Sequence, residues 1–199
     1  MKDEQVKELL YQALETEMGG QEIYRTAIEC AQEPGLKEEW QKYLSETENH
    51  ERVLRATFEK IGLDPEVETP GRKGIRHKGE ALVQAMKMAL AEGGGPAAQL
   101  VAAESVVEAE TRDHQNWELI GRVAQASSGS KKAALQEAYE EVEDEEDEHL
   151  YHTMGWAREL WIKSLGMPAV LPPPEEEKEV KTAIGAARAE QAREEMLRR

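Results

Sequence analysis

The amino-acid sequence predicts an all-α protein with four long antiparallel helices, and three observations support this class. No stretch of the chain alternates apolar and polar residues with the period of two that is typical of strands. Apolar residues instead recur every three to four positions along most of the chain, which is the period of an amphipathic helix. Clusters of Pro, Gly and Ser divide this pattern into four segments of roughly 25–35 residues, each long enough for a helix of about 40–50 Å.

The first two helices are expected over 3–32 and 36–61. Pro34 and Gly35 stop the first helix, and Gly62 provides the C-terminal residue of the second. Because the loop between these helices is short, they must run antiparallel to each other as neighbours. Together they form the first helical hairpin of the predicted fold.

A long connection separates this hairpin from a second one. The connection begins with an irregular stretch over 63–78, which holds two prolines and two glycines, and continues as a short amphipathic helix over 79–91. The sequence Gly-Gly-Gly-Pro at 93–96 precedes the third long helix, expected over 97–126, and the fourth follows over 130–165. The connection is long enough to cross the bundle, so the second hairpin can pack against the first.

The last part of the chain differs in character from the helical segments before it. Three consecutive prolines at 172–174 form a stiff spacer, and the charged segment after them carries only a weak apolar stripe. We expect one helical domain over 1–167 and a Pro-linked, charged helical tail over 168–199. The tail is interpreted as a helix outside the core that is either solvated or docked on a partner.

The composition argues against several classes of function. The 199 residues include 25 basic and 41 acidic side chains, a net charge of −16, which opposes binding to nucleic acid and to anionic membranes. No run of about 18 apolar residues exists that could span a bilayer. The segment over 1–10 has acids where a signal peptide is apolar, so we expect a cytoplasmic protein. The single cysteine, Cys30, excludes an intrachain disulfide and a four-cysteine iron site.

Each of the four long helices has an apolar stripe, and each stripe turns polar near its middle. A stripe that faces a core should stay apolar, because burying an unpaired charge is costly. In the third helix, for example, Glu110 and His114 are four residues apart and so lie on one face. The residues that interrupt the four stripes, in chain order, are Glu17, Glu46, Thr47, His50, Glu110, His114, Glu145, Glu146 and His149.

These interruptions predict a metal site. In an antiparallel bundle the middles of the helices lie at the same height, so the carboxylates and imidazoles should converge. Such a cluster is not stable as bare charges in a low-dielectric interior, but two divalent cations would neutralise it. Oxygen and imidazole ligands without a thiolate suit iron or manganese and are also compatible with zinc.

Taken singly, these residues have simpler interpretations. One helical glutamate, such as Glu17, is commonly a surface residue, and one histidine, such as His50, is commonly a satisfied core or boundary residue. Glu146 belongs to a segment over 137–148 whose acids either form a solvated face or raise the local concentration of cations. The metal-site interpretation depends on the coincidence that all four apolar stripes turn polar at mid-length.

At these residues the chain resembles the ferritin-like superfamily. It looks closest to the small bacterial stress-associated ferritin-like proteins, with rubrerythrins and bacterioferritins as more distant relatives. The strongest local match is 34–62, whose Glu-Thr-x-x-His core is similar to the second helix of that group. Segment 10–18 is similar to the metal-bearing part of the first helix, 107–110 to the third, and the Glu-x-x-His of 146–149 to the fourth. The resemblance covers about 8–165.

The resemblance implies a fold, a ligand set and a role for each ligand. The fold is a ferritin-like antiparallel four-helix bundle with a long crossover between its second and third helices. Glu146 would bridge the metal ions together with Glu46 or Glu110. His50 and His149 would be terminal ligands, and Glu17 would be terminal or bridging. The full expected set of metal ligands is Glu17, Glu46, His50, Glu110, His114, Glu146 and His149.

Two residues depart from the family pattern. The usual glutamate three residues before the histidine of the second helix would be at position 47, which is Thr47 here. Glu46 must then substitute from a neighbouring position, or that ligand is missing. His114 is unusual in the third helix and could be a compensating ligand. The site is therefore expected to be asymmetric, to bind one metal ion better than the other, or to be vestigial.

The resemblance also implies a function. It implies a non-haem centre of two iron ions, with manganese or zinc as substitutes, that oxidises ferrous iron or reduces dioxygen or peroxide. Such an oxidoreductase would act in iron handling or oxidative-stress defence, would need an external reductant, and would form a homodimer or a larger homo-oligomer. The alternative is a metal-free or vestigial-site bundle that serves as a stress-related scaffold or assembly module. A third hypothesis is that the tail docks cargo or a partner.

Overall fold

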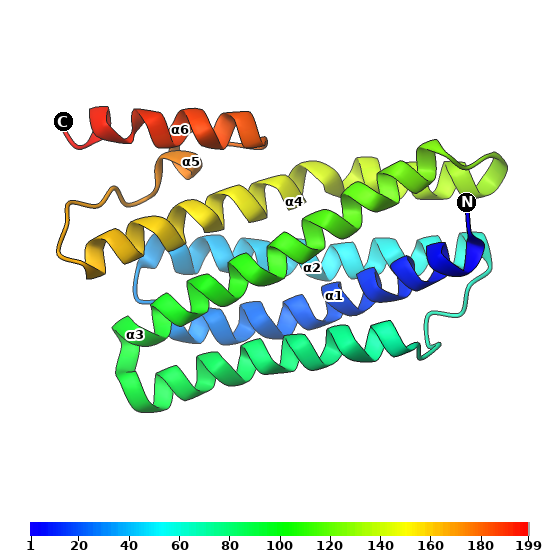
Figure 1. The fold of residues 1–199 in the computed structure, drawn as a ribbon, viewed down its shortest axis with the longest axis horizontal. Helices are drawn as coiled ribbons and strands as arrows, with labels where there is room; N and C mark the ends of the chain where they lie inside the picture. The colour runs from blue at the N-terminus through cyan, green and yellow to red at the C-terminus, as the bar shows by residue number, and fades with distance from the viewer. Residues whose placement is uncertain (199) are drawn as a thin grey trace.

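The computed structural model describes residues 1–198, and within that range it contains helices and connecting segments but no strand. The all-α class predicted from the sequence is therefore confirmed. Figure 1 shows α1, α2, α4 and the two halves of α3 as long rods that lie side by side, with α6 on the outer side of α4. The helices are α1 (Asp3–Cys30), α2 (Pro34–Ile61), α3 (Pro70–Gln125), α4 (Gly129–Ser164), α5 (Pro174–Glu177) and α6 (Ala183–Met196).

Helices α1 and α2 form an antiparallel hairpin, as the short loop between them requires (Figure 1). Pro34 occupies the first turn of α2, and Gly62 ends α2 with a φ of 73°. This left-handed conformation favours glycine because it has no Cβ. The side-chain oxygen of Gln99 accepts hydrogen bonds from the backbone N–H groups of Gln32 and Glu33, at 2.6 and 2.8 Å. The loop is thus held by a side chain from α3.

The connection between α2 and α3 is shorter than the sequence predicts. We expected an irregular stretch over 63–78, but α3 begins at Pro70 and only 63–69 is non-helical. The side-chain oxygen of Thr69 caps the helix by accepting a hydrogen bond from the N–H of Arg72. Pro70 takes a first-turn position, where its missing N–H costs nothing. This Thr-Pro pair therefore starts a helix instead of breaking one.

Two glycines in the first half of α3, Gly71 and Gly79, face α1. A Cβ atom at Gly71 would lie 1.9 Å from the Oε1 atom of Glu8. A Cβ atom at Gly79 would lie 3.9 Å from the Cα atom of Gly19. The short helix expected over 79–91 is therefore the second part of a longer helix, which packs closely along α1.

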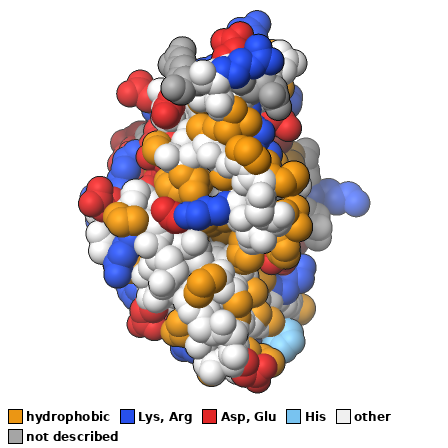
Figure 2. Space-filling model, turned by 90° about the vertical axis from the view of Figure 1, so that its left-hand side faces the viewer, with side chains coloured by type: hydrophobic (Ala, Val, Ile, Leu, Met, Phe, Trp, Pro, Cys, Tyr) orange, Lys and Arg blue, Asp and Glu red, His pale blue; other side chains and the backbone are white. Residues whose placement is uncertain are grey.

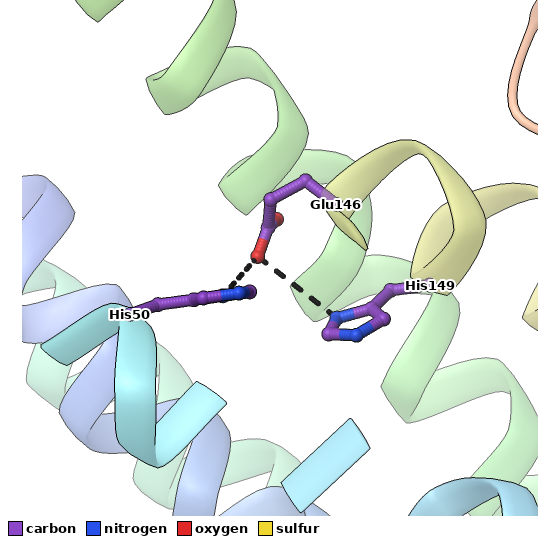
Figure 3. A group of neighbouring side chains, drawn as sticks. All are labelled: His50, Glu146 and His149. Carbon is purple, nitrogen blue, oxygen red and sulfur yellow. Dashed lines mark ion pairs between the residues drawn. The ribbon is translucent and has the colours of Figure 1, made fainter. Parts of the chain in front are cut away.

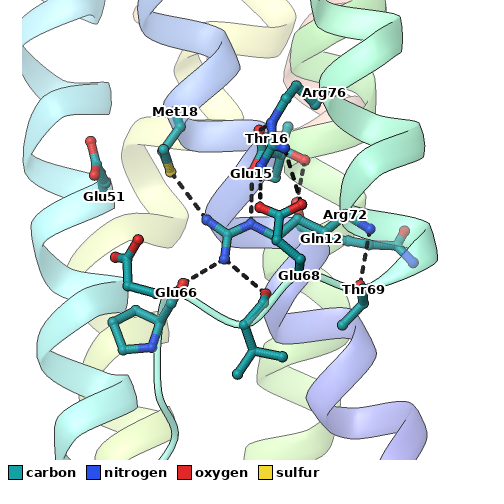
Figure 4. A network of polar contacts seen from close by, with 12 residues as sticks. Gln12, Glu15, Thr16, Met18, Glu51, Glu66, Glu68, Thr69, Arg72 and Arg76 are labelled. Carbon is teal, nitrogen blue, oxygen red and sulfur yellow. Dashed lines mark hydrogen bonds and ion pairs between the residues drawn. The ribbon is translucent and has the colours of Figure 1, made fainter.

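Buried charges join the first half of α3 to α1, as Figure 4 shows. The Arg72 side chain is only 3% exposed, and its Nε atom donates a hydrogen bond to Glu15 Oε2 at 2.7 Å. Its Nη1 atom donates to the backbone carbonyls of Pro65 and Val67, which fixes the connection after α2. Arg76 Nε donates to Glu15 Oε1 at 2.6 Å. Glu15 is thus shared by two arginines of the crossover helix.

Helix α3 bends at Gly94, at the break expected from residues 93–96. Gly94 has a φ of 71° and a ψ of −176°, a conformation that favours glycine. The bend turns the second half of α3 back along the bundle, and a short turn at 126–128 leads into the antiparallel α4 (Figure 1). The second half of α3 and α4 thus form an antiparallel pair, and the first half of α3 packs on α1.

The apolar core consists of two clusters, one towards each end of the bundle. The first includes Tyr24, Trp40, Tyr43, Val106 and Leu160, and the second includes Leu10, Leu54, Phe58, Trp117 and Leu135. Each cluster draws residues from α1, α2, the second half of α3 and α4. The two clusters are separated along each of these helices by the segments that carry the mid-helix polar residues. A polar layer is thus enclosed between two apolar ones.

The C-terminal segment packs against α4 of the same chain (Figure 1). Arg158 donates two hydrogen bonds to the carboxylate of Glu175, at 2.7 and 2.9 Å, and Arg193 Nε donates to the fully buried Glu159 at 2.7 Å. Helices α5 and α6 therefore dock on α4 of their own chain. The last residue of the predicted tail, Arg199, lies outside the described residues.

Figure 2 shows the end of the molecule where α3 bends, where apolar side chains lie among charged ones. Several large apolar residues of α4 and the segment after it are exposed: Trp161 is 43% exposed, Leu165 is 65% and Met167 is 50%. Among the described residues, no helix has the length and apolar character needed to cross a membrane.

Candidate metal centre

A layer of buried acidic and imidazole side chains lies between the two apolar clusters. Helices α1 and α2 contribute one side chain each, and α3 and α4 contribute two each. Every one of these residues is 4% exposed or less. The six residues of the layer are Glu17, His50, Glu110, Asp113, Glu146 and His149.

Two sets of three side chains are close enough to share a metal ion, and Glu146 belongs to both. The first set is His50, Glu146 and His149, whose potential ligand atoms all lie within 4.8 Å of one another (Figure 3). The second set is Glu17, Asp113 and Glu146, with the same maximum separation. Glu146 thus occupies the position between the two sets.

His50 presents its two ring nitrogens to different surroundings. Nδ1 faces the cluster, 2.8 Å from Glu146 Oε1 and 3.7 Å from Glu17 Oε2. Nε2 faces outwards and lies 2.7 Å from Glu145 Oε2. Because a carboxylate accepts hydrogen bonds, Glu145 keeps the proton on Nε2 in the neutral imidazole. The lone pair of Nδ1 is then directed at the cluster, as a metal ligand requires.

His149 has the same arrangement on the other side of the layer. Its Nδ1 atom faces the cluster, 3.7 Å from Glu110 Oε2 and 3.9 Å from Glu146 Oε1. Its Nε2 atom lies 2.9 Å from Glu46 Oε2. The rings of His149 and His50 are stacked with their centres 5.6 Å apart. Both histidines are therefore oriented by an outer carboxylate.

The two outer carboxylates are exchanged between α2 and α4, because each helix supplies the carboxylate that contacts the histidine of the other helix. Glu46 lies four residues before His50 in α2, yet it contacts the histidine of α4. Glu145 lies four residues before His149 in α4, yet it contacts the histidine of α2. The exchange fails at one position, because the residue three before the histidine is Glu146 in α4 but Thr47 in α2.

Each residue of the layer has an inward polar atom that is buried and has no hydrogen-bond partner among the described residues. The contact between His50 Nδ1 and Glu146 Oε1 is short, but it lacks the alignment of a hydrogen bond. An unpaired buried polar atom costs about 1–3 kcal/mol, so six together need another partner. A hard divalent cation suits these donors. The unpaired atoms are Glu17 Oε2, His50 Nδ1, Glu110 Oε2, Asp113 Oδ1, Glu146 Oε2 and His149 Nδ1.

The cluster disturbs the proton affinity of its own members. Burial raises the pKa of Glu17, and the charges of Asp113 and Glu146 raise it further, although Trp117 opposes this with a 2.7 Å hydrogen bond. Burial lowers the pKa of His149, but the adjacent glutamates outweigh burial and raise this pKa to about 10. The cluster without metal therefore retains protons that a cation must displace.

The structure brings five of the seven expected ligands into the layer: Glu17, His50, Glu110, Glu146 and His149. The other two lie elsewhere. Glu46 is in the outer position beside His149 Nε2, with its side chain 20% exposed. His114 lies outside the layer, with its Nδ1 atom 2.9 Å from Asp147 Oδ1 and its side chain 27% exposed. The carboxylate of α3 that joins Glu110 in the layer is instead Asp113.

Asp113 was missed by the sequence interpretation, although a signal was present. It lies three residues after Glu110, which places both side chains on the same face of α3. The orienting role of Glu145 was also missed, because its partner His50 lies on a different helix. That pairing has no signature in the sequence.

A second buried polar group lies beside His149. The ring of Tyr43 lies 4.1 Å from the His149 ring, centre to centre. The Tyr43 hydroxyl donates to Glu39 and lies 3.1 Å from His152 Nδ1, and Trp156 Nε1 also donates to Glu39. His152 is buried as well. This network holds Tyr43, and through it the His149 ring, in place.

Comparison with known proteins adds no family to this description. No family model, no curated protein and no solved structure matches the chain. The fold and the buried layer are therefore the basis for a functional assignment.

Proposed function

We propose that the chain is a ferritin-like four-helix bundle that binds two divalent metal ions, with iron as the metal it serves. One observation carries the proposal: four helices direct six carboxylate and imidazole donors at one enclosed region, and each donor has an unpaired atom there. The connectivity supports it, because two antiparallel hairpins joined by a long crossover are the arrangement of ferritin-like bundles.

The charges and distances support a two-ion site. Four buried carboxylates carry four negative charges, which two divalent ions would balance. Glu17 Oε2 lies 3.7 Å from His50 Nδ1, and Glu110 Oε2 lies 3.7 Å from His149 Nδ1, so each histidine has a carboxylate near its inward nitrogen. Glu146 belongs to both metal-sized sets and is the candidate bridge.

The residues around the ligands provide what such a centre needs. Glu46 and Glu145 fix the histidine tautomers, and Trp117 restrains Glu17 by a hydrogen bond. The apolar clusters on either side exclude water. When bound, iron would supply the redox chemistry, the oxidation of ferrous iron by dioxygen or peroxide. With one cysteine in the chain, reduction of the centre would need an external reductant.

Anaerobic titration with ferrous iron tests this proposal. The wild-type protein should bind two ions per chain, and the Glu17→Ala and His149→Ala variants should each lose tight binding because a ligand is removed. His77→Ala is the matched control, since His77 is exposed on the first half of α3. Absence of tight binding in the wild type, or variants that bind as it does, would contradict the proposal.

The second candidate is a metal-free bundle that acts as a stress-related scaffold. The raised pKa values of Glu17 and Asp113 favour it, because protons can reduce the charge of the layer without a metal. A chelator separates the two functions. If metal is bound, its removal should lower the melting temperature by mass action, whereas a scaffold should melt at the same temperature with and without chelator.

A further inference from the structure

A polar cavity of about 200 Å³ opens between α3 and α4 and reaches the buried layer. Its floor is formed by Glu146, whose side chain is 2% exposed, together with Trp117. The rim includes Thr182 and Ala183, at the start of α6. The cavity therefore connects the surface of the protein with the carboxylate that both metal-sized sets share.

The glutamate at the floor of the cavity has an unsatisfied carboxylate oxygen. Glu146 Oε2 is buried and has no hydrogen-bond partner among the described residues. Trp117, beside it, donates its indole hydrogen bond to Glu17. A cation that reached this floor would therefore lie beside a carboxylate of the layer that still lacks a partner.

The walls of the cavity are acidic. Glu118, Glu143 and Asp147 line it, and neither lysine nor arginine does. His114 lines it as well and is held by Asp147 at 2.9 Å. By contrast, a cavity of about 630 Å³ beside α1 has a mostly apolar lining in which two acidic residues, Glu15 and Glu108, are balanced by Lys78 and Arg112. A cleft with walls of one charge sign concentrates the opposite ion, so the smaller cavity attracts cations.

The carboxylates on the face between α2 and α4 already have partners. There the carboxylates of Glu46 and Glu145 are occupied by the outward nitrogens of the histidines. Lys42 also lies on this face, 3.6 Å from Glu46 and in contact with Glu148, and it adds a positive charge. The face between α3 and α4 therefore offers an acidic cavity that touches the layer.

We propose that this cavity is the access route by which divalent cations reach the buried layer. Glu118 and Glu143 attract the ion at the mouth, and Asp147 with His114 receives it before it passes to Glu146. The inference assigns a role to His114 and to part of the acidic segment of α4 that the ligand set does not use. It rests on the proposed metal-binding function, from which it is separated experimentally by measuring rates in addition to equilibrium binding.

The first experiment removes the charge of the mouth and measures cobalt loading. Anaerobic stopped-flow mixing with Co²⁺ follows the visible absorption of the bound ion. The Glu118→Gln, Glu143→Gln double variant should load Co²⁺ about tenfold more slowly than wild type at low salt, because the electrostatic attraction of the ion to the mouth is lost. For the same reason, its loading rate should depend less on the salt concentration. Equilibrium dialysis should still show two ions per chain.

The matched control removes two charges from the same helix outside the cavity. Glu141 and Asp144 are exposed on α4 and do not line the cavity, so the Glu141→Gln, Asp144→Asn variant should load close to the wild-type rate. If both double variants slow loading equally, the effect is one of net charge, and the proposed route is wrong.

The second experiment obstructs the cavity. Ala183 is exposed at the rim, so Ala183→Trp should leave the fold intact, which circular dichroism checks. Loading and release should both slow by about the same factor, with the dissociation constant unchanged. Loading at the wild-type rate by this variant overturns the route. If wild-type protein binds no Co²⁺ at equilibrium, the metal-binding function itself fails, and the route fails with it.

Discussion

Asp113 and His114 are neighbours in the sequence, but the structure places them in different environments. One residue along a helix turns the side chain by about 100°. Asp113 therefore faces the buried layer, where it is 4% exposed, whereas His114 faces the cavity between α3 and α4. The helical pattern alone favoured His114, because it is four residues from Glu110. The three-residue spacing to Asp113 fits the same face equally well.

The charge of Asp113 should cost stability in the protein without metal. Burial raises the pKa of Asp113, and the charges of Glu146 and Glu110 raise it further. The protonated Asp113 carboxyl therefore contributes its full stabilisation of the folded state below the ordinary pKa of 3.8, and this stabilisation is lost as the pH rises through the raised pKa. We expect Asp113→Asn to raise the melting temperature of the chelated protein at pH 7 and to reduce the increase that metal produces. Calorimetry with and without metal measures both. A lower melting temperature in chelator would contradict this account.

Glu15 should behave in the opposite way. Burial acts to raise its pKa, but hydrogen bonds and ion pairs with Arg76 and Arg72 outweigh burial and lower it. The ionised Glu15 carboxylate therefore stabilises the folded state above its ordinary pKa of 4.5, and this stabilisation is lost as the pH falls through the lowered pKa. Glu15→Gln should cost about 3 kcal/mol at neutral pH, because Arg72 stays buried without its partner.

Urea unfolding at pH 7 and pH 3 measures this effect, and the difference from wild type should shrink at the lower pH. Glu68→Gln is the control, since Glu68 pairs with Arg76 at the exposed surface and its side chain is 42% exposed. An equal loss of stability in the two variants would show that burial does not determine the contribution of Glu15.

At the scale of elements, close packing decides where glycine belongs. A Cβ atom at position 71 would overlap side-chain atoms of Glu8 and Gln12 on α1, and Gly155 lets the C-terminal segment approach α4. A Cβ atom at position 155 would lie 2.5 Å from Glu175 Oε2 and 3.0 Å from the Cβ atom of Pro173. Glu175 cannot easily move away, because Arg158 holds both of its carboxylate oxygens.

The Gly155→Ala variant should therefore loosen α5 and α6 while the other helices remain folded. Alanine normally stabilises a helix relative to glycine by about 1 kcal/mol, so loosening of the tail would have to come from the contact. Overpacking of this kind costs about 1–3 kcal/mol. Hydrogen exchange in α6 should accelerate. Gly19→Ala is the control, because the added Cβ would meet no neighbouring atom within 4 Å. In this variant the amide hydrogens of α6 should exchange as in the wild-type protein.

At the scale of the whole molecule, the polar layer is enclosed because the helices are in register. The two apolar clusters exclude water from either side, and the hairpins bring α2 and α4 together so that each supplies the carboxylate for the other's histidine. The first half of α3 lies outside this arrangement on α1 and contributes none of the six residues of the layer. The site is thus a property of the assembled helices.

The exposed apolar side chains at the end of α4 lead us to expect self-association (Figure 2). Leu165 and Met167 are at least half exposed, and a homodimer or larger oligomer would cover them. Light scattering should give a mass above the 22.4 kDa of one chain, and the Leu165→Lys, Met167→Lys variant should reduce it. Ile184→Lys, on α6, is the control for a charge added at an exposed apolar residue. A wild-type monomer would contradict this expectation.

Much of the fold could be predicted because helical periodicity and chain breakers are local properties. The C-terminal end of α2 at Gly62 and the bend of α3 at Gly94 follow from the positive φ angles that glycine tolerates. The start of α3 at Pro70 was mispredicted, since the same Thr-Pro and Gly residues mark either a loop or a capped helix. Contacts of Arg72 and Arg76 with Glu15 decide between these outcomes.

The sequence by itself determined that the protein is all-α and that acidic and imidazole residues interrupt the apolar stripes at mid-helix. These features follow from residue order within one helix. Only the tertiary structure decided that Asp113 joins the layer in place of His114, and that Glu46 and Glu145 orient histidines of opposite helices. The reason is geometric: the rotation and register of packed helices depend on all their contacts together, and no single helix encodes them.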